Sequence, residues 1–113
     1  MITIVQDGFN ITVIGHAGYA PKGEDIVCSA VSAIIGTLAR ALEEGSEMLE
    51  EKTIKLKDGD SELDCVPKEE YTVNVQMIYW TILIGLNAIA ESYPENVIFV
   101  EGGLEMEAGG DVS

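Results

Sequence analysis

The chain has 113 residues, 47% of them hydrophobic and 23% charged, a composition that argues against intrinsic disorder and predicts a single globular domain. Twenty acidic residues against six basic ones give a net charge of −14, which argues against direct binding to nucleic acid because phosphates would be repelled. A basic partner would instead be attracted, although an acidic surface also serves solubility alone.

The N-terminal residues show no cationic segment followed by a long apolar one, so we expect no signal peptide. The longest strongly apolar segment, residues 77–90, is shorter than the ~20 residues that cross a bilayer, and we expect no membrane contact. Two cysteines fit a reducing compartment better than a disulfide framework. The sequence therefore predicts a cytoplasmic protein.

The first half of the chain predicts a β-hairpin, a loop and a helix. Residues 1–6 and 11–17 are rich in β-branched side chains and are separated by a short turn, which predicts two strands with His16 at the end of the second. After the loop, apolar residues recur at helical spacing, with Asp25 as the N-cap and Gly45 just past the helix. This stripe consists of Val27, Val31, Ile34, Ile35, Leu38 and Leu42.

A second hairpin is predicted over residues 53–66. Apolar and polar side chains alternate on both sides of Asp58-Gly59, which is the strongest short signal for such a turn, and Pro67 ends the second strand. The residues expected on its buried face are Ile54, Leu56, Leu63 and Cys65.

A second helix over about residues 75–92 and a last strand over 97–100 complete the domain. The order ββαββαβ predicts an α+β fold, a two-layer sandwich of about five mostly antiparallel strands with two helices on one face. We expect this single domain to cover residues 1–103, and residues 104–113 to form an acidic, glycine-rich and mobile tail.

The predicted second helix is apolar on more than one side. One stripe is enough to pack on a sheet, so the apolar residues outside it need another partner. We favour a homodimer through helix 75–92, with a cleft wall or a well-covered core helix as the alternatives. The stripe contains Val75, Ile78, Ile82, Leu86 and Ile89, and the residues outside it are Met77, Tyr79, Trp80 and Ile84.

The only histidine and one of the two cysteines lie at the ends of a glycine-containing loop, residues 15–28. Counted from the N-cap Asp25, Cys28 is the third residue of the helix, where free N–H groups and the helix dipole stabilise a thiolate. The N–H groups of Cys28 and Ser29 are candidate donors to an oxyanion. The loop can fold His16 back onto the helix start as a base, with Asp25 as the nearest carboxylate to orient it.

Each of these residues also has a structural interpretation. Asp25 fits a plain N-cap, Cys28 a small buried helix residue, and His16 a histidine at a strand end. Ser32, one turn after Cys28, either contacts the thiolate or fills a polar gap. Cys65 fits the core, and a disulfide to Cys28 does not suit a reducing compartment. Since His16, Cys28 and Cys65 supply at most three ligands without the usual spacing, we expect no metal and no cofactor.

Residues 15–34, GHAGYAPKGEDIVCSAVSAI, resemble the signature of the ribosomal-processing cysteine protease family, Prp. In that family a strand ends in Gly-His-Ala, a glycine-containing loop follows, and Asp-Ile-Val-Cys leads into a helix with a nearby Val-Ser. By position, the resemblance assigns His16 and Cys28 as the catalytic pair and Asp25 as the recurrent acidic residue. Ser32 matches the serine of the Val-Ser.

The resemblance implies a small, dimeric bacterial endopeptidase that removes the N-terminal extension of large-subunit ribosomal protein number twenty-seven during ribosome assembly. Its substrate would join an apolar, aromatic extension to a basic protein, which suits an apolar helix and an acidic surface. The substrate loop, with Gly15, Gly18, Tyr19 and Gly23, would admit the peptide and then cover it. Ser29 replaces an expected alanine, and the acidic tail is not a feature of the family.

Two other functions remain as alternatives. The first is a non-enzymatic, ribosome-associated module whose acidic face binds a basic ribosomal protein. The second is a redox-sensing thiol protein, which would need Cys65, or Cys28 of a second copy, within disulfide reach of Cys28.

Overall fold

Over residues 1–102, which the structure describes, the chain forms five strands and two long helices. In chain order they are β1 (Ile2–Asp7), β2 (Asn10–Gly15), α1 (Ile26–Glu44), β3 (Leu49–Lys57), β4 (Asp60–Pro67), α2 (Thr72–Ser92) and β5 (Val97–Val100). This structure is a computed structural model, and the predicted tail 104–113 lies outside the described residues.

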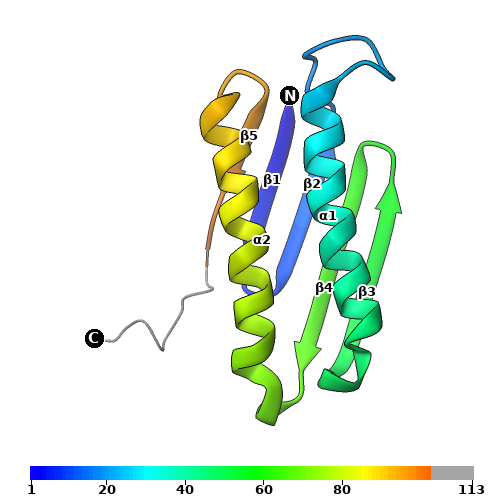
Figure 1. Cartoon of the computed structure of the whole chain (residues 1–113), viewed down its shortest axis with the longest axis vertical. Helices are drawn as coiled ribbons and strands as arrows, with labels where there is room; N and C mark the ends of the chain where they lie inside the picture. The colour runs from blue at the N-terminus through cyan, green and yellow to red at the C-terminus, as the bar shows by residue number, and fades with distance from the viewer. Residues whose placement is uncertain (103–113) are drawn as a thin grey trace, which may run out of the picture.

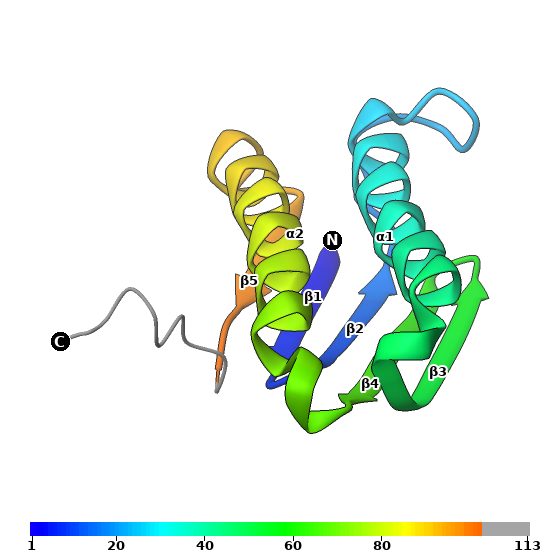
Figure 2. The same ribbon diagram turned by 60° about the horizontal axis from the view of Figure 1, so that its bottom comes forward.

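The strands form one sheet in the order β3-β4-β2-β1-β5, and both helices lie on the same face of it (Figures 1 and 2). Neighbouring strands are antiparallel, except that β5 runs parallel to β1. The predicted two-layer α+β sandwich is therefore confirmed.

The hairpin of β1 and β2 forms the centre of the sheet. Its β-branched residues alternate between the two faces, so Ile2, Ile4 and Ile11 point toward the helices and are buried. The end of β2 lies beside the start of α1 (Figure 1). His16, the first residue after β2, therefore leaves the sheet next to the first turn of that helix.

The bounds of α1 agree with the prediction, including its N-cap, Asp25. At its other end Gly45 has a φ of −101°, so it does not adopt the left-handed conformation that is common for a glycine after a helix. A Cβ on Gly45 would lie 2.8 Å from Cε of Met48, the flexible end of a side chain that can shift, and 3.1 Å from the carbonyl oxygen of Ala41, a tight contact. Ile34 is half-buried against Gly85 of α2, and the rest of the stripe is buried: Val27, Val31, Ile35, Leu38 and Leu42.

The predicted hairpin with Asp58 and Gly59 as its turn is formed by β3 and β4. The expected burial is wrong for Leu56, which is 53% exposed. Leu56 lies on β3, an edge strand, so it has a neighbouring strand on one side only. The other residues predicted for this face are inside: Leu63 and Cys65 are buried and Ile54 is half-buried.

Helix α2 begins at Thr72, slightly before the predicted start. Tyr79, expected on its second apolar side, is instead fully buried, and its ring packs edge-on against Phe9 with centroids 5.1 Å apart. Met77, Trp80 and Ile84 do lie on the exposed side. Much of the apolar character of α2 therefore belongs to the core, and the rest faces outward.

The helical segments Ile26–Glu44 and Glu69–Ser92 are each long and apolar enough to cross a membrane by length and composition alone. The sequence prediction considered only the shorter segment 77–90 and did not identify them. In this fold each helix packs one side on the sheet (Figure 2).

Truncation of Leu63 and of Leu56 tests the packing of the hairpin, because the first side chain is buried and the second is exposed. We expect Leu63→Ala to lower the free energy of unfolding by about 2–5 kcal/mol, because it leaves a cavity in the core. Leu56→Ala, the same chemical change at an exposed site, should cost less than about 1 kcal/mol. Urea unfolding of both variants measures the difference, and equal losses would contradict the described packing.

Candidate active site

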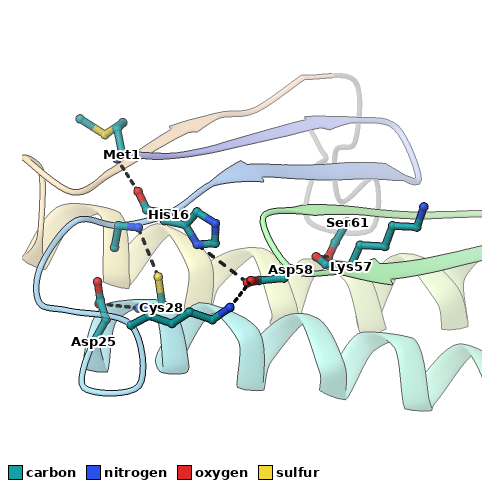
Figure 3. Close-up of polar contacts among 9 residues, drawn as sticks. Met1, His16, Asp25, Cys28, Lys57, Asp58 and Ser61 are labelled. Carbon is teal, nitrogen blue, oxygen red and sulfur yellow. Dashed lines mark hydrogen bonds and ion pairs between the residues drawn. The ribbon is translucent and has the colours of Figure 1, made fainter.

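One cleft, of about 430 Å³, collects most of the residues that the sequence singled out. It lies where four segments meet: the end of β2, the loop that follows, the first turns of α1 and the turn between β3 and β4 (Figure 3). Its lining includes His16, Lys22, Cys28, Ser29, Ser32 and Asp58.

Cys28 is the third residue of α1, and its side chain is partly buried in the wall of the cleft. Its Sγ accepts a hydrogen bond from the backbone N–H of Ala17, 3.2 Å away (Figure 3). Ala17 is buried and follows His16 in the chain, so this hydrogen bond connects the segment after β2 to the start of α1. A donor aimed at sulfur and the start of a helix are surroundings in which a cysteine commonly acts as a nucleophile.

Asp25 joins the loop to the helix. Its Oδ1 accepts the N–H groups of Val27 and Cys28 at 3.0 and 2.9 Å, and its Oδ2 accepts those of Tyr19 and Ala20 at 2.9 and 3.3 Å. Desolvation raises the pKa of this carboxyl, but the four backbone donors, with Cys28 the strongest, outweigh it and lower the pKa below its ordinary value. Asp25 is therefore both a helix cap and an anchor for the loop.

His16 lies at the rim of the cleft with 58% of its side chain exposed. Its Nδ1 is 3.9 Å from Oδ1 of Asp58, and within residues 1–102 its ring makes no hydrogen bond to the Cys28 thiol. Its carbonyl oxygen accepts a hydrogen bond from the ammonium of Met1 (Figure 3). The structure thus brings imidazole and thiol to one cleft without joining them. The expected contact between His16 and Asp25 is not formed, because both Asp25 oxygens are bound to the backbone.

The two N–H groups expected to bind an oxyanion are both occupied. The N–H of Cys28 donates to the Asp25 carboxylate, and that of Ser29 donates to the Asp25 carbonyl at 3.1 Å in the first turn of α1. Ser32 lines the cleft one turn after Cys28, and its hydroxyl makes no hydrogen bond in the described part of the chain. In this arrangement an oxyanion would draw on other donors.

The glycines of the predicted substrate loop have two different roles. Gly18 and Gly23 line the cleft with φ of +70° and +93°, a left-handed backbone that favours glycine. Gly15 belongs to the end of β2, where its φ is +97° and a Cβ would collide with the carbonyl oxygen of Met1. Gly15 is therefore needed for close packing of the strand end rather than for opening the loop.

Residues between α2 and β5 contact the loop that follows β2, and the sequence did not predict these contacts. Tyr19 does not line the cleft as expected; its ring packs edge-on against Tyr93, with centroids 5.6 Å apart. The side-chain amide of Asn96 donates to the carbonyl of Ala17 at 3.0 Å. These contacts fix the backbone that carries the donor to Cys28.

The turn between β3 and β4 is a part of the site that sequence reasoning treated only as a hairpin signal. Gly59 has a φ of +74°, and a Cβ there would lie 2.8 Å from Nε2 of His16, so the ring rests on this glycine. The N–H of Gly15 donates to the carbonyl of Gly59 at 2.9 Å. Across the cleft mouth, Nζ of Lys22 binds Oδ2 of Asp58 at 2.8 Å.

Cys65 lies in the core beside Tyr79 and does not line the cleft. Burial raises the pKa of its thiol, so it stays protonated and unreactive at neutral pH. Both cysteines are free. Among residues 1–102 there is no group of three or more His, Cys, Asp or Glu side chains placed to hold a metal ion.

The chemistry of this cleft centres on Cys28. Its sulfur has both a helix N-terminus and a backbone donor beside it, and the one imidazole of the chain opens onto the same space. A two-layer α+β fold with such a cleft defines a thiol-dependent hydrolase. The family model of the cysteine protease Prp matches residues 2–98, and the chain belongs to this family of cysteine proteases.

Individual relatives agree with this assignment. The chain is 38% identical over 95 residues to the ribosomal processing cysteine protease Prp of Mycoplasma genitalium, covering 80% of this chain and 86% of the relative. It is 30% identical over 101 residues to the protein of the same name from Mycoplasma pneumoniae, covering 88% and 93%. The fold is similar to that of Prp from S. aureus, solved in complex with a covalently linked product peptide, with a TM-score of 0.77 and 27% identity over 89% of this chain and 99% of that chain.

Asp25→Asn tests the anchoring role of the carboxylate. Asparagine keeps one oxygen for the helix N–H groups but turns an NH₂ toward those of Tyr19 and Ala20, where donor faces donor. We expect amide hydrogen exchange at these two positions to accelerate at least about tenfold. Glu24→Gln is the control, since its side chain makes no hydrogen bond in the described chain; equal exchange in both variants would rule out the anchor.

The same variant predicts a pH dependence of stability. The pKa of Asp25 is lowered on folding, so its charged form stabilises the protein above the ordinary pKa of 3.8, and this contribution is lost as the pH falls through the lower, folded value. The difference in unfolding free energy between wild type and Asp25→Asn should therefore shrink as the pH is lowered below 3.8. Denaturant unfolding at a series of acidic pH values measures it, and a difference independent of pH would contradict the assignment.

Proposed function

We propose that this protease removes the N-terminal extension of large-subunit ribosomal protein number twenty-seven, with Cys28 as the nucleophile and His16 as general base and acid. The observation that carries the proposal is the Cys28 sulfur at the start of α1, with the Ala17 N–H directed at it and His16 on the same cleft. We also propose that it acts in the cytoplasm, where free thiols such as these persist.

The chemistry proceeds in two stages. His16 takes the proton of the Cys28 thiol, and the thiolate attacks the scissile carbonyl carbon to form a tetrahedral intermediate. When this collapses, the C–N bond breaks, the imidazolium gives its proton to the departing amine, and the acyl group stays on sulfur. Water then attacks the thioester, His16 takes a proton from it, and the acid product leaves as the Cys28 sulfur is released.

The charge and surface of the chain suit such a substrate. A net charge of −14 attracts a basic ribosomal protein at long range. The S. aureus relative has also been solved in complex with a substrate peptide, with a TM-score of 0.71 and 25% identity. A cleft of about 430 Å³ with an exposed imidazole at its rim gives access to a peptide segment.

Removal of either catalytic group should abolish cleavage. Cys28→Ala and His16→Ala are each expected to lower kcat/KM by at least about a thousandfold, because no other group in the cleft replaces a thiolate or an imidazole. The assay follows a peptide spanning the extension and the start of the ribosomal protein by mass spectrometry. Cys65→Ala is the matched control and should keep its activity, since Cys65 lies outside the cleft.

Retained cleavage by Cys28→Ala would refute the mechanism. Tight binding of the basic protein without cleavage by the wild type would instead favour a non-enzymatic module.

We further propose that the protease is a homodimer through α2. Four apolar side chains at helical spacing stand on its outward face, each between 46% and 58% exposed: Val73, Met77, Trp80 and Ile84. A large aromatic residue in the middle of such a stripe is a typical anchor of a self-complementary interface.

Sedimentation of surface variants tests this interface. Trp80→Lys should raise the dimer dissociation constant at least about tenfold, because it places a charge at the centre of the stripe. Val100→Lys is the control, since Val100 is similarly exposed but lies on β5. A strictly monomeric wild type at micromolar concentration would remove the proposal.

A further inference from the structure

The turn between β3 and β4 presents one carboxylate oxygen to the active-site imidazole. Oδ1 of Asp58 is 3.9 Å from Nδ1 of His16 and accepts no hydrogen bond within the described residues, whereas Oδ2 binds Nζ of Lys22 at 2.8 Å (Figure 3). The position of the turn is fixed, because the Gly59 carbonyl accepts the N–H of Gly15, the residue just before His16. Asp58 therefore stays within reach of the ring.

The other charged groups that line the cleft or lie beside His16 form no ion pair with its ring in the described residues. Both oxygens of Asp25 are bound to backbone N–H groups, and Asp60 pairs with Lys55 at 3.0 Å. Lys57 lines the cleft with its side chain directed away from His16 (Figure 3), and the ammonium of Met1 binds the His16 carbonyl, which places a positive charge beside this residue. Among the described residues, Asp58 is thus the carboxylate that lies within ion-pair distance of the imidazole.

We propose that Asp58 is a positioning residue that stabilises the imidazolium formed when His16 takes the proton of Cys28, and that Lys22 restrains this effect by holding the second carboxylate oxygen. The inference rests on the proposed function, because it requires proton transfer from the Cys28 sulfur to the imidazole; no other bond changes in that step.

The opposing effects of the two residues follow from their charges. The carboxylate attracts the imidazolium. The ammonium of Lys22, bound to the other oxygen of Asp58, repels the imidazolium and offsets part of that attraction. The hydrogen bond from Lys22 also lowers the pKa of Asp58, which keeps the carboxylate ionised at neutral pH. Lys22 lies on the loop after β2 and Asp58 in the turn between β3 and β4, so this ion pair links two segments that line the cleft.

Alkylation of Cys28 by iodoacetamide tests the proposal without substrate. The rate, measured by mass spectrometry between about pH 5 and 9, reports the thiolate present at each pH. Asp58→Asn should slow alkylation about two- to fivefold on the acidic side and leave it unchanged at high pH, where the thiol ionises unaided. Lys22→Met should accelerate it on the acidic side, and the double variant should behave as Asp58→Asn, because Lys22 acts through that carboxylate.

The variants are chosen to keep the fold. Asn-Gly is as favourable as Asp-Gly in a hairpin turn, so Asp58→Asn preserves the hairpin. Asp7→Asn is its control, since Asp7 also precedes a left-handed glycine at a hairpin turn but lies at the far end of β1. Lys52→Met on β3 is the control for Lys22→Met.

The results distinguish the role of Asp58 from that of the pair Cys28 and His16. If His16→Ala slows alkylation but Asp58→Asn matches its control, the positioning role is wrong and the catalytic pair stands. If Lys22→Met and Asp58→Asn both slow alkylation, the pair is a structural bridge and the proposal fails. If His16→Ala matches wild type, the catalytic pair and the role of Asp58 are both overturned.

Discussion

The four backbone N–H groups bound by the Asp25 carboxylate hold the active site together. Asp25 is only 7% exposed, and a buried carboxylate is tolerated when its oxygens are fully hydrogen-bonded. Two of the donors begin α1 and two belong to the loop, so one side chain sets the position of the helix relative to the loop. The location of Cys28 and the path of the chain after His16 both depend on this carboxylate.

Cys28 and His16, the proposed catalytic pair, are held with different rigidity. Cys28 is partly buried on a helix, and its sulfur is hydrogen-bonded to Ala17, which Asn96 supports from another segment. The His16 ring is mostly exposed and rests on Gly59, so fewer contacts restrain it than restrain the Cys28 side chain. A separation of base and nucleophile in the free protein is common, and such contacts tighten when substrate binds.

The charges of the cleft differ from those of the whole chain. The protein carries 20 acidic and 6 basic residues, yet Lys22 and Lys57 both line the cleft. The acidic surface would therefore attract the proposed basic substrate at long range, while the cleft itself carries charged groups of both signs. The ion pair between Lys22 and Asp58 joins the loop after β2 to the turn between β3 and β4, beside the His16 ring.

The helices and strands, and the residues at the two ends of the loop 15–28, could be predicted from the sequence because they depend on local patterns. Helical spacing and the N-cap Asp25 put Cys28 in the first turn of α1, and alternating β-branched residues put His16 at the end of β2. Asp58-Gly59 likewise predicted its turn. These signals act within a few residues, so they can be read along the chain.

The residues that surround the His16 ring and the loop 15–28 follow from the tertiary structure alone. β4 pairs with β2, which brings Asp58 and Gly59 against His16, and the segment before β5 brings Asn96 to Ala17. The same packing buried Tyr79 and left Leu56 exposed on the edge strand. The order of strands arises from burial of the whole sheet under both helices, a sum of many weak contacts that no local pattern of the chain encodes.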